Sequence, residues 1–162
     1  MMATPAIART IQLEPGTLGD LDGVMKVMDA AFGRHYGEAW TRSQLAGILP
    51  MDGISLTLAR QEGLDTAVGF SLVRTVGEES ELLLLAVLPT RQREGIGGRL
   101  LEDFMERAAK KGVIRVHLEV RDGNAAVGMY RAAGFEQAGK RRNYYHAPGG
   151  DRFDALTLVK KL

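Results

Sequence analysis

The segment from Leu82 to Leu101, LLLLAVLPTRQREGIGGRLL, constrains this chain more than any other. Its apolar run stops at Pro89, and a basic turn with three glycines then precedes a sequence of helical periodicity. The pattern predicts a strand that leads through a glycine-rich turn into a helix. Such a turn presents unpaired backbone N–H groups at the positive end of the helix dipole, which favours phosphate groups. The spacing Gln92-x-x-Gly95-x-Gly97 matches neither the nucleotide P-loop nor G-x-G-x-x-G, so it indicates a pyrophosphate ligand of another kind.

Hydrophobic periodicity predicts the other elements. Asp20 is the expected N-cap of a first helix, and Thr41-x-x-Gln44 is a capping box that begins a second helix. The expected helices cover residues 20–32, 41–49, 95–111 and 125–133, and the expected strands cover residues 8–13, 54–60, 67–76, 81–88, 113–120, 135–145 and 154–159. Strand–helix–strand units lie in the middle, and hairpin-like pairs flank them. This order predicts an α/β (α+β) fold with a mixed central sheet and helices on both faces.

Composition limits the classes of protein to which this chain can belong. At 162 residues, of which 45% are hydrophobic, it is expected to form a single domain, residues 1–162, with a real core. The net charge of +1 gives no electrostatic case for nucleic-acid binding. Cysteine is absent, which removes disulfides, thiolate metal sites and a cysteine nucleophile. The sequence contains neither a membrane-spanning apolar run nor a secretory signal pattern, so we expect a cytoplasmic protein.

Three blocks in this order resemble the GNAT superfamily of acyl-CoA-dependent N-acetyltransferases. They are the turn from Ala86 to Gly97, the strand ending His-Leu-Glu-Val-Arg at Arg121, and Asn124 followed by a helix to Tyr130 and Gly134-Phe135. A fourth block, Arg-Arg-Asn-Tyr-Tyr at residues 141–145, is similar to the ribosomal-protein-alanine N-acetyltransferase (RimI) family. The resemblance covers residues 82 to about 158 well, and covers the first eighty residues only in element order and in Trp40. It implies the GNAT fold, with acetyl-CoA as the cosubstrate.

The resemblance also implies a position for the cofactor. The strand backbone pairs with the pantetheine amides, and the glycine turn holds the pyrophosphate, because glycine lets the backbone approach closely. Glu94 departs from the family pattern, and we expect its side chain to point to solvent while its amide still donates. The implied cofactor-binding residues are Leu85, Ala86, Val87, Gln92, Arg93, Glu94, Gly95, Ile96, Gly97, Gly98 and Asn124.

Glu119 and Tyr130 are the candidate catalytic residues. From the residues alone, Glu119 is better interpreted as a solvated or arginine-paired strand carboxylate, and Tyr130 as a core aromatic residue with a satisfied hydroxyl group. The resemblance implies that Glu119 is the general base and that Tyr130 is the general acid that protonates the departing thiolate. Tyr130 follows Asn124 by one position fewer than is usual in the family. If the loop does not absorb this shortening, the helix is rotated by about 100° and Tyr130 leaves the site.

Trp40 and Tyr144 are the candidate substrate-binding residues, although Trp40 is equally a hydrophobic lid. Tyr145 follows Tyr144 on one strand, and alternation places their rings on opposite faces, so one of them is expected in the core. The run Lys140-Arg141-Arg142 is interpreted as a solvated strand end, with contact to a ribosomal partner as the alternative. No metal site is expected, because the three histidines lack ligand spacing.

Three functional hypotheses follow. The first is acetyl-CoA-dependent acetylation of a protein N-terminus, specifically the alanine of a small-subunit ribosomal protein, by direct attack of the amine on the thioester. The second keeps this chemistry with a small-molecule amine as the acceptor. The third is a non-catalytic acyl-CoA-binding module, which the shortened interval before Tyr130 favours. No direct nucleic-acid or membrane partner is expected, and the sequence does not set an oligomeric state.

Overall fold

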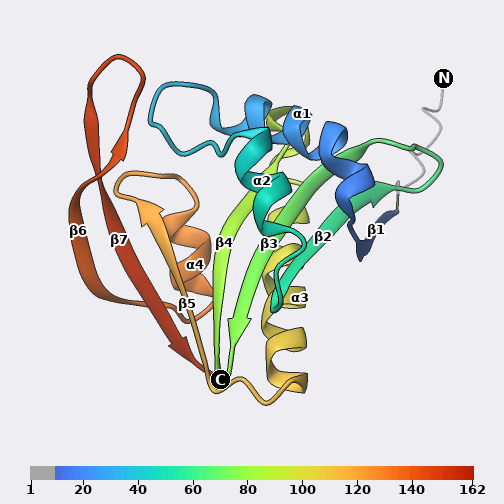
Figure 1. Cartoon of the computed structure of the whole chain (residues 1–162). Coiled ribbons are helices and arrows are strands. Elements are labelled where there is room, and N and C mark those ends of the chain that lie inside the picture. Colours follow the sequence, from blue (N-terminus) through green and yellow to red (C-terminus); the bar gives the residue numbers. More distant parts are fainter. Residues whose placement is uncertain (1–9) are drawn as a thin grey trace, which may run out of the picture.

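A computed structural model describes residues 10–162, which form one seven-stranded mixed sheet (Figure 1). The strand order is β1-β2-β3-β4-β5-β7-β6, and all neighbours are antiparallel except the parallel pair β4 and β5. The strands are β1 (Ile11–Pro15), β2 (Ile54–Gln61), β3 (Ala67–Val76), β4 (Glu79–Val87), β5 (Arg115–Arg121), β6 (Glu136–His146) and β7 (Arg152–Lys161).

Helices cover both faces of the sheet, as expected. The helices are α1 (Leu21–Phe32), α2 (Arg42–Ile48), α3 (Ile96–Lys110) and α4 (Val127–Ala132), with short 3-10 helices η1 (Leu18–Asp20) and η2 (Pro89–Arg91). Buried side chains of α1 and α2 pack with β2, β3 and β4 in one core cluster. Those of α3 and α4 pack with β5 and β7 in a cluster on the other face, and Figure 1 shows α3 behind the sheet. The predicted fold class and order of elements are therefore confirmed.

The sheet opens between β4 and β5. Their parallel pairing runs only from Glu79↔Arg115 to Leu82↔Leu118. At the same point the register of β4 against β3 shifts, so that Leu72 pairs with Leu84 while Val73 pairs with Leu82. This irregularity bends β4 away from β5, and the two strands diverge in Figure 1. The upper part of β4 and the end of β5 thus become the two walls of a cleft.

Several element boundaries differ from the sequence prediction. Of the first expected strand, residues 8 and 9 lie outside the described residues, and β1 continues to Pro15, which an edge strand tolerates. The strand expected from residue 113 begins at Arg115, and Ile114 lies before it with 56% of its surface exposed. Helix α4 is shorter than expected and begins at Val127, and the positive φ of Gly134 terminates this segment as predicted.

One predicted helix cap is confirmed in full, and the other is confirmed in position but not in its hydrogen bond, since Asp20 is the N-cap residue of α1. Thr41 and Gln44 form the expected reciprocal capping box, with Gln44 N–H donating to Thr41 Oγ1 at 3.2 Å and Thr41 N–H to Gln44 Oε1 at 2.7 Å. The Asp20 side chain makes no capping hydrogen bond to α1. Its carboxylate instead accepts from the N–H of Thr17 at 2.8 Å, which closes a capping box around η1. The Asp20 carboxylate therefore does form a helix cap, but it caps η1, the turn that precedes α1.

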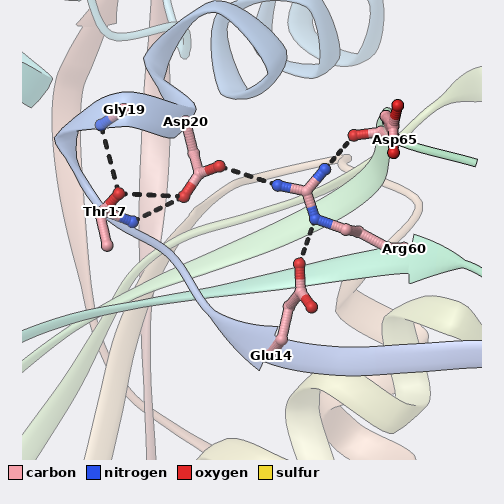
Figure 2. Close-up of polar contacts among 6 residues, drawn as sticks. All are labelled: Glu14, Thr17, Gly19, Asp20, Arg60 and Asp65. Atoms are coloured by element: carbon pink, nitrogen blue, oxygen red, sulfur yellow. Dashed lines mark hydrogen bonds and ion pairs between the residues drawn. The ribbon is translucent and has the colours of Figure 1, made fainter.

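Arg60 ties the N-terminal elements to the sheet (Figure 2). Its guanidinium donates to Glu14 on β1, to Asp20 at 2.8 Å and to the backbone carbonyl of Asp65 in the β2–β3 turn. The Arg60 side chain is only 23% exposed, so water screens these contacts incompletely. A single residue of β2 thereby fixes the edge strand, the start of α1 and the hairpin turn.

Replacing Arg60 by alanine should lower the free energy of unfolding by about 1–2 kcal/mol, because it removes three hydrogen bonds, two of them to carboxylates. Denaturant unfolding of the purified protein measures this. The matched control is Arg42→Ala, which breaks an ion pair with Asp22 that is largely exposed, and it should cost less than about 0.5 kcal/mol. Equal losses in the two variants would show that the Arg60 cluster has no structural role.

Candidate active site

The cleft between the diverging strands is a cavity of about 1010 Å³, a volume typical of ligand-binding sites. Its walls come from β4, from the turn that follows β4, and from the end of β5. The segment that enters α4, the loop of residues 33–40 and two tyrosines of β6 complete it. The predicted site residues that line it are Trp40, Leu85, Ala86, Val87, Gln92, Arg93, Gly95, Ile96, Gly97, Gly98, Glu119, Asn124, Tyr130 and Tyr144. Glu94 alone of the predicted set is absent from the lining.

The upper part of β4 offers a free backbone edge to this cavity. On one side Leu85, Ala86 and Val87 pair with β3, opposite Ser71, Phe70 and Gly69. On the other side the pairing with β5 has already ended at Leu82. Apart from the Val87 carbonyl, which accepts from Gln92 Nε2 at 3.4 Å, the N–H and C=O groups that face the cavity are available to an extended chain that carries amides, as in the addition of a strand to a sheet edge. This is the geometry that a pantetheine arm requires.

The turn after β4 has the backbone conformation of an anion-binding site. Gly95 is the N-cap of α3 with φ +79°, and Arg93 also has a positive φ of 67°. A left-handed N-cap favours glycine, which has no Cβ to oppose it. No side chain caps this helix end, so the first amides of α3 can donate to a ligand. The turn therefore fits a diphosphate at one end of the cavity.

Glu94 lies beside this turn but is held away from the cavity. Its carboxylate oxygens accept from Arg91 Nε at 2.7 Å and from Arg91 Nη2 at 3.1 Å. Arg91 also donates to Gln61 Oε1 at 2.8 Å and lines the cavity. The Glu94 side chain was expected to face solvent. It is 44% exposed, but it also forms an ion pair with Arg91. Sequence reasoning missed Arg91, whose charge offsets the carboxylate that a diphosphate would otherwise meet.

Glu119 lies on β5 where this strand leaves β4, and its side chain is 13% exposed. Oε1 accepts from Arg141 Nε at 3.0 Å, and Oε2 accepts from Thr157 Oγ1 at 2.7 Å. Glu119 is therefore paired with an arginine and also lines the cavity. A carboxylate has about four acceptor positions, so these two contacts leave capacity for a further donor. Arg141, interpreted from sequence as a solvated strand end, instead contacts the candidate base.

Tyr130 remains on the cavity wall despite the shortened interval that precedes it. Asn124 Oδ1 accepts from the N–H of Ala126 at 2.8 Å, and α4 begins directly afterwards at Val127. The side chain of Tyr130 is buried, at 5% exposure, with its ring edge-on to Phe135. Burial, and then the negative charge of Glu38, raise the pKa of the Tyr130 phenol above its usual value. Tyr130 therefore keeps its hydroxyl proton at neutral pH.

The expected alternation of Tyr144 and Tyr145 is wrong, because both line the cavity. The register of β6 against β7 shifts between Arg141 and Tyr145, so residues 142–144 lie opposite Asp154 alone. Asn143 takes φ +53° at this bulge, and its N–H donates to Asp154 Oδ1 at 2.9 Å. The two rings pack edge to face with centroids 4.9 Å apart, and the Tyr145 hydroxyl donates to the carbonyl of Glu119 at 3.4 Å.

Glu38 is the principal site residue that sequence reasoning missed. It lies in the loop of residues 33–40, lines the cavity and is only 9% exposed. Its carboxylate accepts from Arg121 Nε at 3.2 Å and from Asn124 Nδ2 at 2.9 Å. Glu38 and Arg121 are separated by more than eighty positions in the chain, so no local pattern connects them. Within residues 10–162 no group of three or more potential metal ligands is present, and no helix combines the length and apolar character needed to cross a membrane.

The raised pKa values of Tyr130 and Tyr145 predict a loss of stability in alkali. Burial raises both, so above about pH 10 the unfolded chain releases phenolic protons that the folded chain keeps. The two phenols should therefore leave the free energy of unfolding unchanged below this pH, and the free energy of unfolding should decrease as the pH rises above it. Tyrosinate absorbance of folded and unfolded protein measures the difference. Tyr130→Phe should remove one late-titrating phenol, and an unchanged late amplitude in this variant would contradict the assignment.

Comparison with known proteins agrees with this geometry. The model of the acetyltransferase (GNAT) family matches residues 21–135. The bS18-alanine N-acetyltransferase of Haemophilus influenzae is 38% identical over 92 residues, which are 57% of this chain and 63% of that protein. The chain thus matches less than two thirds of the length of this curated relative.

Two solved structures superpose over nearly the whole chain. The ribosomal-protein-S18-alanine N-acetyltransferase of Escherichia coli has a TM-score of 0.83 and 29% identity, with 94% of each chain covered. Arabidopsis thaliana NAA60 in complex with acetyl-CoA has a TM-score of 0.80 and 18% identity, with 94% of this chain and 99% of that chain covered, which supports the fold alone. Since the family model matches well over half of its length, this chain belongs to the acetyltransferase (GNAT) family.

Proposed function

We propose that this chain transfers the acetyl group of acetyl-CoA to the N-terminal amine of a protein, specifically the N-terminal alanine of ribosomal protein S18. The observation that most supports acetyl transfer is the cleft. In it the edge of β4 that does not pair with β5 leads from the glycine turn toward Glu119 and Tyr130. The names of the relatives support the acceptor. A ribosomal acceptor would place the activity in the cytoplasm.

The cavity would hold the diphosphate and the pantetheine arm of acetyl-CoA. The first amides of α3 and the turn from Gln92 to Gly98 would hold the diphosphate. The backbone of Leu85, Ala86 and Val87 would bind the pantetheine amides and direct the thioester along β4. Arg91 would add a positive charge beside the diphosphate, with Glu94 keeping its guanidinium oriented.

Glu119 would accept the proton that the acceptor amine must lose before it attacks. An α-amino group has a pKa of about 7.7–8.0, whereas that of lysine is about 10.4, so deprotonation of lysine costs roughly 3.4 kcal/mol more. A single carboxylate is therefore better matched to a protein N-terminus. Arg141 and Thr157 hold Glu119 near the end of β5. From there its carboxylate would take the proton from the amine directly or through one water.

Tyr130 would complete the transfer. The amine nitrogen would form a bond to the acetyl carbonyl carbon, the carbon–sulfur bond would break, and the Tyr130 hydroxyl would supply the proton to the leaving sulfur. The second proton, which the nitrogen loses as the amide forms, would return the Tyr130 phenolate to a phenol. The phenol carries its proton at neutral pH, so it has a proton to donate when the thiolate leaves. The chain has no cysteine, so an acyl-cysteine enzyme is excluded and attack is direct.

The acceptor is tested with purified protein, acetyl-CoA and a panel of amines. A peptide with a free N-terminal alanine should give saturable release of CoA and gain one acetyl group by mass spectrometry. The same peptide with a blocked N-terminus and an internal lysine is the control and should not react. Saturable activity on small amines alone would overturn the protein acceptor. Binding of acetyl-CoA without turnover on any amine would overturn the catalytic proposal.

The catalytic roles are tested by two conservative variants. Glu119→Gln and Tyr130→Phe should each lower kcat by about 100-fold or more, the usual contribution of a general base or acid. The matched control is Glu79→Gln, which makes the same change on β4 at the far end of the sheet and should leave kcat unchanged. Full activity of Glu119→Gln between about pH 6 and pH 9 would show that another group takes the proton.

A further inference from the structure

The loop between α1 and α2 closes one side of the cavity through a small number of specific contacts. Figure 1 shows this loop extending from α1 toward the hairpin of β6 and β7. The Tyr36 ring packs edge-on to Phe153 of β7, with centroids 5.0 Å apart. Gly37 has φ +71°, and a Cβ at this position would lie 2.1 Å from the carbonyl oxygen of His146. The loop backbone is therefore in direct contact with the end of β6.

Glu38 connects this loop to the segment that carries Asn124 and Tyr130. One carboxylate oxygen accepts from Arg121 at the end of β5, and the other accepts from Asn124 just before α4. The guanidinium of Arg121 lies 3.6 Å from the centre of the Tyr36 ring, so the same arginine contacts the loop twice. The side chains of Glu38 and Arg121 are only 9% and 13% exposed, so their pairing is largely protected from water.

The contact with Glu38 also sets the orientation of the Asn124 amide. Asn124 Nδ2 donates to Glu38, and Asn124 Oδ1 accepts from the N–H of Ala126. An amide turned by half a rotation would point its oxygen at a carboxylate and its NH₂ at a backbone N–H, which is unfavourable at both ends. The Ala126 carbonyl in turn accepts from the N–H of Tyr130 at 3.1 Å. A short chain of hydrogen bonds therefore runs from Glu38 through Asn124 and Ala126 to Tyr130.

We infer that Glu38 is a positioning residue for acetyl transfer, which fixes the Tyr130 hydroxyl by holding Arg121 at the end of β5 and Asn124 just before α4. The inference rests on the proposed function, because it assigns Glu38 to the general acid of that reaction. It also adds an acidic group to the cavity lining, in addition to Glu119. The phenols of Tyr130 and Tyr145 both face this charge, which contributes to the raised pKa of each.

The test is a double-mutant cycle that combines Glu38→Gln with Tyr130→Phe. Glutamine keeps the shape but presents an NH₂ group to one of the two donors, so one of the two hydrogen bonds is lost. Glu38→Gln should lower kcat by about 10-fold or more with acetyl-CoA saturating, and should cost less than about 2-fold when Tyr130 is already phenylalanine. A full kcat in Glu38→Gln, or an equal loss in both backgrounds, would overturn the inference.

Two further variants separate positioning from a general loss of structure. Glu106→Gln makes the same change at an exposed site on α3 and should leave kcat unchanged. Asn124→Ala breaks the same chain of hydrogen bonds from its other end, so its loss of kcat should be no larger when it is combined with Glu38→Gln. If Glu38→Gln does not fold, the cycle of Asn124→Ala with Tyr130→Phe carries the same test. Additive losses in that cycle would overturn the inference.

A readout without activity distinguishes this inference from the proposed function. The Ala126 N–H, which donates to Asn124 Oδ1, should exchange with solvent about 10-fold faster in Glu38→Gln than in the unmodified protein. Hydrogen exchange followed by NMR measures this whether or not any peptide is acetylated. Unchanged exchange at Ala126 would overturn the inference while leaving the proposed function standing. Faster exchange in a protein that acetylates no amine would instead overturn the function alone.

Discussion

The site depends on the point at which β4 and β5 stop pairing. Hydrogen bonds between them end at Leu82↔Leu118, and the register of β4 shifts against β3 at the same place. Backbone groups beyond this point still require partners, because unpaired N–H and C=O groups are costly away from water. The open edge of β4 therefore favours a ligand that brings its own amides. Glu119 directly follows Leu118, the last residue of β5 that pairs with β4, so the carboxylate lies where the sheet begins to open.

Local patterns predicted most of the fold, because each element is specified by residues that are close in sequence. The periodicity of α1 and α3, the capping box at Thr41 and the apolar run of β4 all behave as expected. Asp20 is at the predicted N-cap position of α1, but two helical segments follow each other there and its carboxylate caps the first of them, η1. The resemblance to a family added what periodicity does not carry, namely which strand and which turn border the site.

The parts of the site that escaped prediction are those made by distant segments. Glu38 reaches Arg121 and Asn124 across more than eighty positions, and Glu119 reaches Thr157 across 38. Alternation failed at Tyr144 and Tyr145 because a bulge interrupts β6, and alternation holds only in a regular strand. Asn143 was the available signal, since asparagine accepts a positive φ more readily than most residues. Neither Arg91 nor Arg141 carried a comparable local signal.

The two carboxylates of the cavity differ in a way that separates their roles. Each is bound by one arginine and one neutral donor, Glu38 by Arg121 and Asn124, and Glu119 by Arg141 and Thr157. Arg121 is 13% exposed, whereas Arg141 is 61% exposed. Water screens and competes for the exposed Arg141, so in the proposed reaction Glu119 would give up this arginine to an incoming ammonium group at less cost than Glu38 would give up Arg121. Breaking the buried pair would strand a charge away from water, which holds Glu38 in place. The difference in burial therefore favours Glu119 as the residue that meets the acceptor and Glu38 as the residue that keeps the surrounding structure fixed.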